Sequence, residues 1–256
     1  SAGNHGLAVA AAARLAGTRA RIYVSSGVSA TRVSRLRRQG AEIVRVEGIY
    51  DDAARAAAAD GSSENTLLVA DTSADPADPI VAGVMDGYRV IAGEVRSQLD
   101  AARSPRPTHL FVQAGVGGLA AALTDGLHSY LDAPARIVVV EPESADCVGR
   151  ALAAGAPSPV EGSLATSATM LACAEASAPA LAILSHHGVD AITVEEDALL
   201  AGPAPLSAHG GPATTPSGAA GLAGLTTVLS GAALARSLEV GPRSRVLVVV
   251  TEGPQA

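Results

Sequence analysis

Short runs of β-branched residues alternate with longer Ala- and Leu-rich stretches, and this alternation limits the fold more than any other feature. The runs typical of strands are residues 20–24, 41–46, 67–70, 108–112, 136–140, 190–194 and 245–250. The stretches typical of helices are residues 4–16, 29–39, 50–59, 79–101, 118–131, 168–175, 178–186 and 217–235. Strands that alternate with helices predict parallel sheets with helices packed on both faces. The sequence therefore predicts an α/β protein with doubly wound sheets.

Segments rich in Gly, Pro and Asp divide this pattern. Residues 71–79 read as a connection, and they place a domain boundary between a small domain at 1–72 and a large domain at 73–256. Residues 155–166 resemble a loop, and residues 202–216 hold four Pro and three Gly, which predicts irregular structure.

The composition excludes several classes of protein. Acidic residues outnumber basic ones by 25 to 18, which argues against a nucleic-acid partner. Two Cys cannot make a disulfide framework, and no uninterrupted apolar run is long enough to cross a membrane. We therefore expect a cytoplasmic protein with no nucleic-acid partner and no membrane partner. All 18 basic residues are Arg, so the chain contains no lysine amine.

The first segment that could carry chemistry is Ser1-Ala2-Gly3-Asn4-His5-Gly6, which opens a helix. Backbone amides at a helix start point outward and can bind a carboxylate. The alternative is an ordinary helix cap made by Ser1 or Asn4. The run of six such residues favours a carboxylate site.

The second is the run from Gln113 to Leu119, a glycine-rich turn between a strand and a helix. Glycines let the backbone approach an anion, and phosphate is the natural ligand. Gly115, Gly117 and Ala120 also fit a dinucleotide fingerprint, with Glu141 as the ribose-binding acid. A plain tight turn is the third interpretation.

Three weaker signals follow other elements. Asp71 follows a predicted strand, where it could act as a general base or cap the next segment. Thr251 follows the last strand, where its hydroxyl could bond a heterocycle nitrogen. Ser217 opens an Ala- and Gly-rich helix and could serve as its N-cap. His186 and His187 lack a third ligand at metal spacing, and we predict no metal site.

Taken together, the Ser1–Gly6 run and the Gly115–Gly118 loop resemble the fold-type II family of pyridoxal-phosphate enzymes. Further matches, in the same order along the chain, look most like the diaminopropionate ammonia-lyase branch. They are Asp71-Thr72, Gly87-Tyr88, Glu141-Pro142, Ala145-Asp146-Cys147, Leu171-Ala172-Cys173, Ser217–Leu222 and Thr251-Glu252-Gly253. The resemblance implies the two open sheets of the tryptophan synthase β-like architecture. The Ser-x-Gly-Asn-His-Gly run is also shared with threonine dehydratases.

The resemblance implies a role for each matching residue, with pyridoxal 5′-phosphate as cofactor. Gly115, Val116, Gly117, Gly118 and Leu119 would bind the phosphate through backbone amides. Thr251 would face the pyridine nitrogen, where a hydroxyl suits β-elimination over transamination. Asn4 would contact the cofactor, and Ser1, Asn4 and His5 would hold the substrate carboxylate. Asp71 would abstract the α-proton of a small amino acid, and a homodimer is implied.

The implied reaction is an ammonia-lyase elimination that turns 2,3-diaminopropionate into pyruvate and ammonia. The family needs a Schiff-base lysine, and this chain has none. The chain also opens on Ser1 in mid-motif, so we expect that an N-terminal part with the lysine is missing and that the chain as given is an inactive fragment. The alternatives are a threonine or serine dehydratase-like lyase, a non-catalytic phosphate-binding remnant, and an NAD-dependent dehydrogenase.

Cys147 and Cys173 both lie in the branch-specific runs. We hypothesise that they lie close together, either as a pair or as two free buried thiols.

Overall fold

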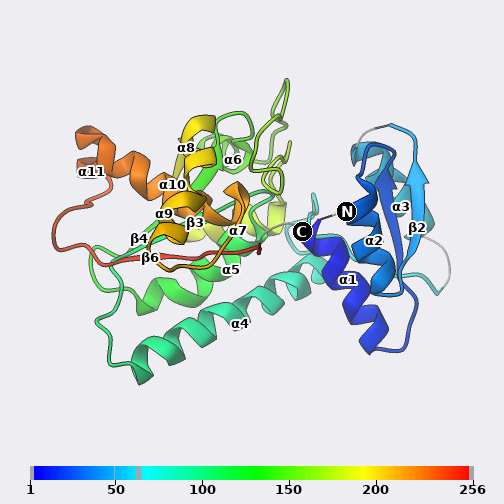
Figure 1. Ribbon diagram of the computed structural model, residues 1–256, viewed down its shortest axis with the longest axis horizontal. Coiled ribbons are helices and arrows are strands. Elements are labelled where there is room, and N and C mark those ends of the chain that lie inside the picture. The colour runs from blue at the N-terminus through cyan, green and yellow to red at the C-terminus, as the bar shows by residue number, and fades with distance from the viewer. Residues whose placement is uncertain (1–2, 49, 62–64, 254–256) are drawn as a thin grey trace. The chain divides into compact units, whose positions relative to one another are not determined.

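The structure is a computed structural model, and it describes residues 3–48, 50–61 and 65–253 (Figure 1). The chain divides into two compact units, Ser1–Ala70 and Asp71–Ala256, which are described one at a time. Among the described residues, no helix is both long enough and apolar enough to span a bilayer.

The first unit is built around a two-stranded parallel sheet, in which Arg21 lies opposite Glu42 and Ser25 lies opposite Val46. Its elements are α1 (Asn4–Leu15), β1 (Arg21–Ser25), α2 (Ala30–Arg38), β2 (Glu42–Val46) and α3 (Tyr50–Gly61). Ser29 caps α2 by accepting a bond from the Arg32 amide at 3.4 Å. A small core that includes Val24 and Leu36 packs α1 and α2 on the sheet.

The strand predicted at residues 67–70 is wrong. In the described part of this unit, only β1 and β2 form a sheet, and residues 67–70 do not join it. Leu67 and Leu68 are 68% and 39% exposed, so the apolar run is not buried. An apolar run becomes a strand only when a neighbouring strand accepts its backbone bonds.

The second unit is organised by a four-stranded parallel sheet in the order β5-β4-β3-β6. Its strands are β3 (His109–Gln113), β4 (Arg136–Pro142), β5 (Asp190–Val194) and β6 (Val246–Val248). In the two central strands successive side chains alternate between two cores, because a strand has a period of two. Leu110 and Val112 enter one core, whereas Phe111 enters the other.

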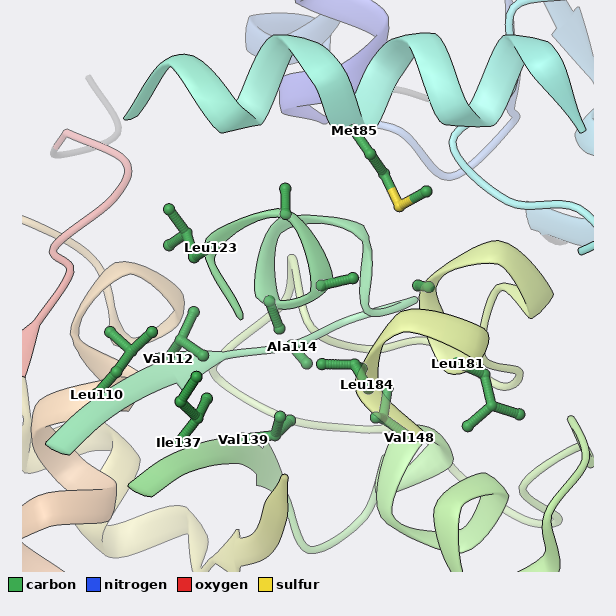
Figure 2. Close-up of a cluster of buried hydrophobic side chains, with 14 of the residues drawn as sticks. Met85, Leu110, Val112, Ala114, Leu123, Ile137, Val139, Val148, Leu181 and Leu184 are labelled. Carbon is green, nitrogen blue, oxygen red and sulfur yellow. The ribbon is translucent and has the colours of Figure 1, made fainter. Parts of the chain in front are cut away.

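Helices cover both faces of this sheet, as the alternating pattern predicts (Figure 1). The helices of this unit are α4 (Pro79–Ala101), α5 (Gly118–Leu127), η1 (His128–Tyr130), α6 (Cys147–Ala154), α7 (Ala178–His187), α8 (Glu196–Ala201), α9 (Pro203–Ala208), α10 (Pro216–Ser230) and α11 (Ala232–Ser237). Figure 2 shows the core on one face, where Leu123 and Met85 lie between α4, α5 and the strands. Ala-rich helices pack closely on the strands here, which suits a chain with few aromatic residues.

The start of α4 follows directly from its sequence. Asp78 accepts bonds from the amides of Ile80 at 2.8 Å and Val81 at 3.2 Å, and Pro79 occupies the first helical turn. These are the preferred residues for an N-cap and for the position after it. The helix spans Pro79–Ala101, as the sequence predicts.

Three other predictions in this unit are corrected. Residues 168–175 form turns, not a helix, because a long-range bond from the Met170 amide to Ser217 Oγ at 3.1 Å overrides helix propensity. Residues 202–216 are only partly irregular, since Pro203 begins the short helix α9. The helix predicted at 217–235 is divided at Gly231 into α10 and α11.

Candidate functional site

The glycine-rich loop lies at the carboxyl edge of the four-stranded sheet, between β3 and α5. Gly117 is the N-cap of α5 and has a left-handed φ of 98°, which glycine adopts without strain. Gly117 has no side chain that could cap this helix start. The first amides of α5 are therefore available to an external acceptor, and the helix dipole favours an anion there.

Two glycines of the loop are required by their neighbours. A Cβ added at Gly115 would lie 3.0 Å from Cys173 Sγ and 3.1 Å from the Met170 carbonyl oxygen. A Cβ at Gly117 would lie 3.2 Å from the Cβ of Ala180. The loop is thus pressed against its surroundings on one side, and its shape is fixed before any ligand binds.

Glu141 ends β4 at the same edge, and its carboxylate closes the start of α6. Its oxygens accept bonds from the amides of Val148 at 2.8 Å and Gly149 at 2.7 Å. The side chain is 1% exposed, and burial raises the pKa of Glu141 to about 7 against the opposing effect of the two amides. Both oxygens are engaged, so Glu141 does not have the free carboxylate that the dehydrogenase interpretation requires.

Thr251 lies beyond the end of β6, in contact with Gln113 at the end of β3. Gln113 Nε2 donates to Thr251 Oγ1 at 2.7 Å and to the Val249 carbonyl at 3.1 Å. Thr214 Oγ1 donates to the backbone carbonyl of Thr251 at 2.9 Å. Thr251 is therefore held by both its side chain and its backbone near the glycine-rich loop.

The Ser217-Gly218 pair supports the same segment in a way that the sequence did not reveal. Thr215, not Ser217, caps α10 by accepting from the Gly218 amide at 3.2 Å. A Cβ at Gly218 would lie 1.8 Å from the Thr251 carbonyl oxygen. This glycine lets α10 approach the end of β6.

Asp71 opens the second unit, and the segment that follows it is tied to the glycine-rich loop. Ser177 links the two, because its Oγ accepts from the Ser73 amide at 3.3 Å and its amide donates to the Val116 carbonyl at 2.9 Å. The charge of Asp71 also contributes to raising the pKa of Tyr88, although burial is the larger cause. Asp71 and the loop thus belong to one region of this unit.

Cys147 and Cys173 are free thiols that flank the loop. Cys147 Sγ donates to the Gly115 carbonyl at 3.3 Å. Burial, with a smaller effect from Asp71, raises the pKa of Cys173 to about 12, and burial likewise raises the pKa of Cys147 far above its usual value. Both thiols therefore stay protonated at neutral pH and act as packing groups in this state.

The predicted carboxylate-binding residues belong to the first unit. Gly3 is the N-cap of α1, and Asn4 is the first residue of that helix and is exposed. His5 Nε2 lies 2.9 Å from the Val69 carbonyl oxygen, so the ring is anchored to residues 67–70. Ser1 lies outside the described residues.

A cavity of about 310 Å³ lies at the opposite, amino edge of the large sheet. His128, Arg136 and His187 line it together with Asp190 and Glu239, and no residue of the predicted site does. Within the part of the chain that the structure describes, no group of three or more His, Cys, Asp or Glu side chains is placed to hold a metal ion.

Comparisons with known proteins identify relatives of this chain. The profile of a family described as pyridoxal-phosphate dependent enzyme matches residues 1–252. The chain is 34% identical over 263 residues to a diaminopropionate ammonia-lyase of Salmonella typhimurium, covering 98% of this chain and 65% of the relative.

Solved structures show the same relationship. The holo diaminopropionate ammonia lyase of Escherichia coli matches with a TM-score of 0.85 at 28% identity, covering 99% of this chain and 65% of that one. A threonine deaminase from T.th. matches with a TM-score of 0.82 at 26% identity, covering 100% of this chain and 77% of that one. The chain therefore spans about two thirds of the length of the ammonia-lyases it matches.

Proposed function

Because the chain belongs to the pyridoxal-phosphate-dependent enzyme family, we propose that it is the part of an ammonia-lyase that binds pyridoxal 5′-phosphate and positions a small amino acid. The proposed reaction converts 2,3-diaminopropionate and water to pyruvate and two ammonia. The open amide start of α5, beside a threonine hydroxyl, is the observation that carries the proposal. The similarity to ammonia-lyases supports the substrate class.

The residues present fit the cofactor. The amides of Gly115–Leu119 would hold the phosphate, because Gly117 at the N-cap of α5 has no side chain to occupy them and its surroundings fix the shape of the loop. Thr251 would bond the ring nitrogen. The cofactor, when bound, supplies a ring that delocalises the electron pair left on the substrate after Cα–H cleavage.

Two sets of residues would act on the amino acid. Asp71 would accept the α-proton as a general base, since Ser177 ties the segment that follows it to the glycine-rich loop. Asn4 and His5 lie at the start of α1, where backbone amides favour an anion, and together with Ser1 they would bind the substrate carboxylate.

Among the alternatives, a threonine or serine dehydratase-like lyase uses the same machinery and differs in substrate. The match to threonine deaminase supports keeping it as the second candidate. The dehydrogenase alternative requires Glu141 to bind a ribose, but the Glu141 carboxylate is engaged in capping α6. We also propose a cytoplasmic location, which agrees with two free thiols.

The first test is a titration of the chain with pyridoxal 5′-phosphate, with pyridoxal as the control that lacks the phosphate. We expect saturable binding of the phosphorylated compound and binding weaker by at least about tenfold for pyridoxal. Equal affinity for the two would contradict the proposed phosphate cradle.

The second test measures turnover in the chain joined to a leading segment that carries a Schiff-base lysine. Pyruvate release is compared for 2,3-diaminopropionate, threonine and D-serine. Asp71→Asn should lower turnover by at least about 100-fold, because the general base is lost. Retained turnover in that variant would remove Asp71 from the proposal, and a preference for threonine would favour the second candidate.

A further inference from the structure

The amide of Gln113 can adopt only one orientation. Its Nε2 lies 3.1 Å from the Val249 carbonyl oxygen, and a backbone carbonyl can only accept a hydrogen bond. The amide nitrogen must therefore face that carbonyl. The opposite orientation would place two acceptor oxygens against each other.

This orientation determines the role of Thr251. Because the NH₂ group also lies 2.7 Å from Thr251 Oγ1, the threonine oxygen must accept that bond. Its own hydroxyl hydrogen then points elsewhere. Among the described residues, no acceptor is bonded to that hydrogen, so Thr251 offers a donor to a ligand.

Burial of the Gln113 side chain also lowers the stability of the fold. The side chain is 2% exposed, and within the described ranges its Oε1 has no hydrogen-bond partner. Gly221 of α10 makes room for it, since a Cβ there would lie 3.2 Å from Oε1. An unpaired buried carbonyl destabilises a fold, and such groups in native proteins are frequently tied to function.

We propose that Gln113 is a positioning residue that fixes Thr251 as a hydrogen-bond donor and thereby selects the unprotonated form of the cofactor's ring nitrogen. This inference rests on the proposed function. A neutral pyridine nitrogen has a lone pair that can accept the Thr251 hydrogen, whereas a protonated pyridinium nitrogen has none. The neutral ring withdraws electrons less strongly, which suits elimination.

The test uses pyridoxal 5′-phosphate labelled with ¹⁵N in the ring and bound to the whole chain. The ¹⁵N chemical shift reports whether the ring nitrogen is protonated, independently of turnover. We expect a neutral nitrogen in the wild type. Gln113→Glu should reverse the polarity, because a carboxylate accepts the Thr251 hydrogen and leaves Oγ1 to accept from a protonated ring.

Thr251→Ser is the matched control, because it keeps the hydroxyl and should keep the neutral nitrogen. A protonated ring in the wild type, or a neutral ring in Gln113→Glu, would overturn the inference while leaving the proposed cofactor site intact. Absence of cofactor binding by the wild type would overturn the proposed function and this inference with it.

A buried carboxylate at residue 113 could prevent folding, which circular dichroism would reveal. Gln113→Met then decides, because it keeps the volume and removes the donor that holds Thr251. We expect its affinity for pyridoxal 5′-phosphate to fall about fivefold, as for loss of one oriented hydrogen bond. Unchanged affinity in a folded Gln113→Met variant would overturn the inference.

Discussion

The starts of α5 and α6 occupy equivalent places in the fold, yet one is open and the other is closed. Each helix follows a central strand at the carboxyl edge of the same sheet. At α6, the carboxylate of Glu141 accepts bonds from two amides of the first turn. At α5, the N-cap residue is Gly117, which has no side chain to accept bonds from the first amides.

The difference shows that helix starts at the same edge of one sheet can be satisfied by the chain itself or left open. A helix start attracts a negative charge wherever it occurs. The chain supplies its own carboxylate at α6 and supplies a hydroxyl from Thr215 at α10. At α5 the N-cap is a glycine with no side chain, as the proposed phosphate site requires.

The largest expected effect comes from a substitution at the start of α10. Gly218→Ala should lower the free energy of unfolding by more than about 3 kcal/mol, because its Cβ would overlap the Thr251 carbonyl at 1.8 Å. Urea denaturation measures the change. Gly93→Ala is the matched control, because nothing lies within 4 Å of its added Cβ and helix propensity favours Ala. Equal stability of the two variants would contradict the close approach of α10 to residue 251.

The second prediction concerns how Glu141, at the start of α6, makes the free energy of unfolding depend on pH. The folded-state pKa of Glu141 is raised to about 7 from an ordinary value of 4.5, so the folded protein holds the proton more tightly than the unfolded chain. Its contribution to the free energy of unfolding is therefore full below pH 4.5 and is lost as the pH rises to about 7. The loss amounts to at most about 3 kcal/mol.

The comparison with Glu141→Gln isolates this term from all other titrating groups. The difference in unfolding free energy between wild type and variant should shift with pH across that window. A difference that stays constant from pH 4.5 to pH 7 would show that Glu141 does not titrate there.

The third prediction disturbs the loop at the start of α5. Gly117→Ala adds a Cβ that would lie 3.2 Å from the Cβ of Ala180 and 3.3 Å from Val148 Cγ2, on a residue with a left-handed φ of 98°. Because the loop must shift away from these side chains, we expect affinity for pyridoxal 5′-phosphate to fall at least about tenfold, with a stability loss of about 1 to 3 kcal/mol. Gly155→Ala is the control for backbone strain, because its φ is 73° and no atom lies within 4 Å of its added Cβ. Equal cofactor affinities in the two variants would argue against a phosphate at α5.

Much of the fold follows from local sequence signals. Asp78 and Pro79 mark the start of α4, and the β-branched run at 190–194 coincides with β5. Predictions failed where tertiary contacts decide the outcome. Residues 67–70 lack a neighbouring strand, and the turns around Met170 depend on a bond to Ser217, 47 residues away.

The same distinction holds for the site. The loop of Gly115–Leu119 could be recognised from its glycines between a strand and a helix. The partnership of Gln113 with Thr251 could not, because the two residues lie 138 positions apart. The sequence places Glu141 at a strand end, where the dehydrogenase alternative gives it a ribose to bind, because no pattern in the sequence shows that it caps α6 seven residues later.

Backbone amide NMR of the chain during titration with pyridoxal 5′-phosphate tests the central claim most directly. The account predicts that the amide resonances of Gly115–Leu119 shift as the phosphate binds. The capped amides of Val148 and Gly149 at α6, and of Gly218 at α10, should shift much less. Shifts concentrated at α6 or α10, with the resonances of Gly115–Leu119 unmoved, would contradict it.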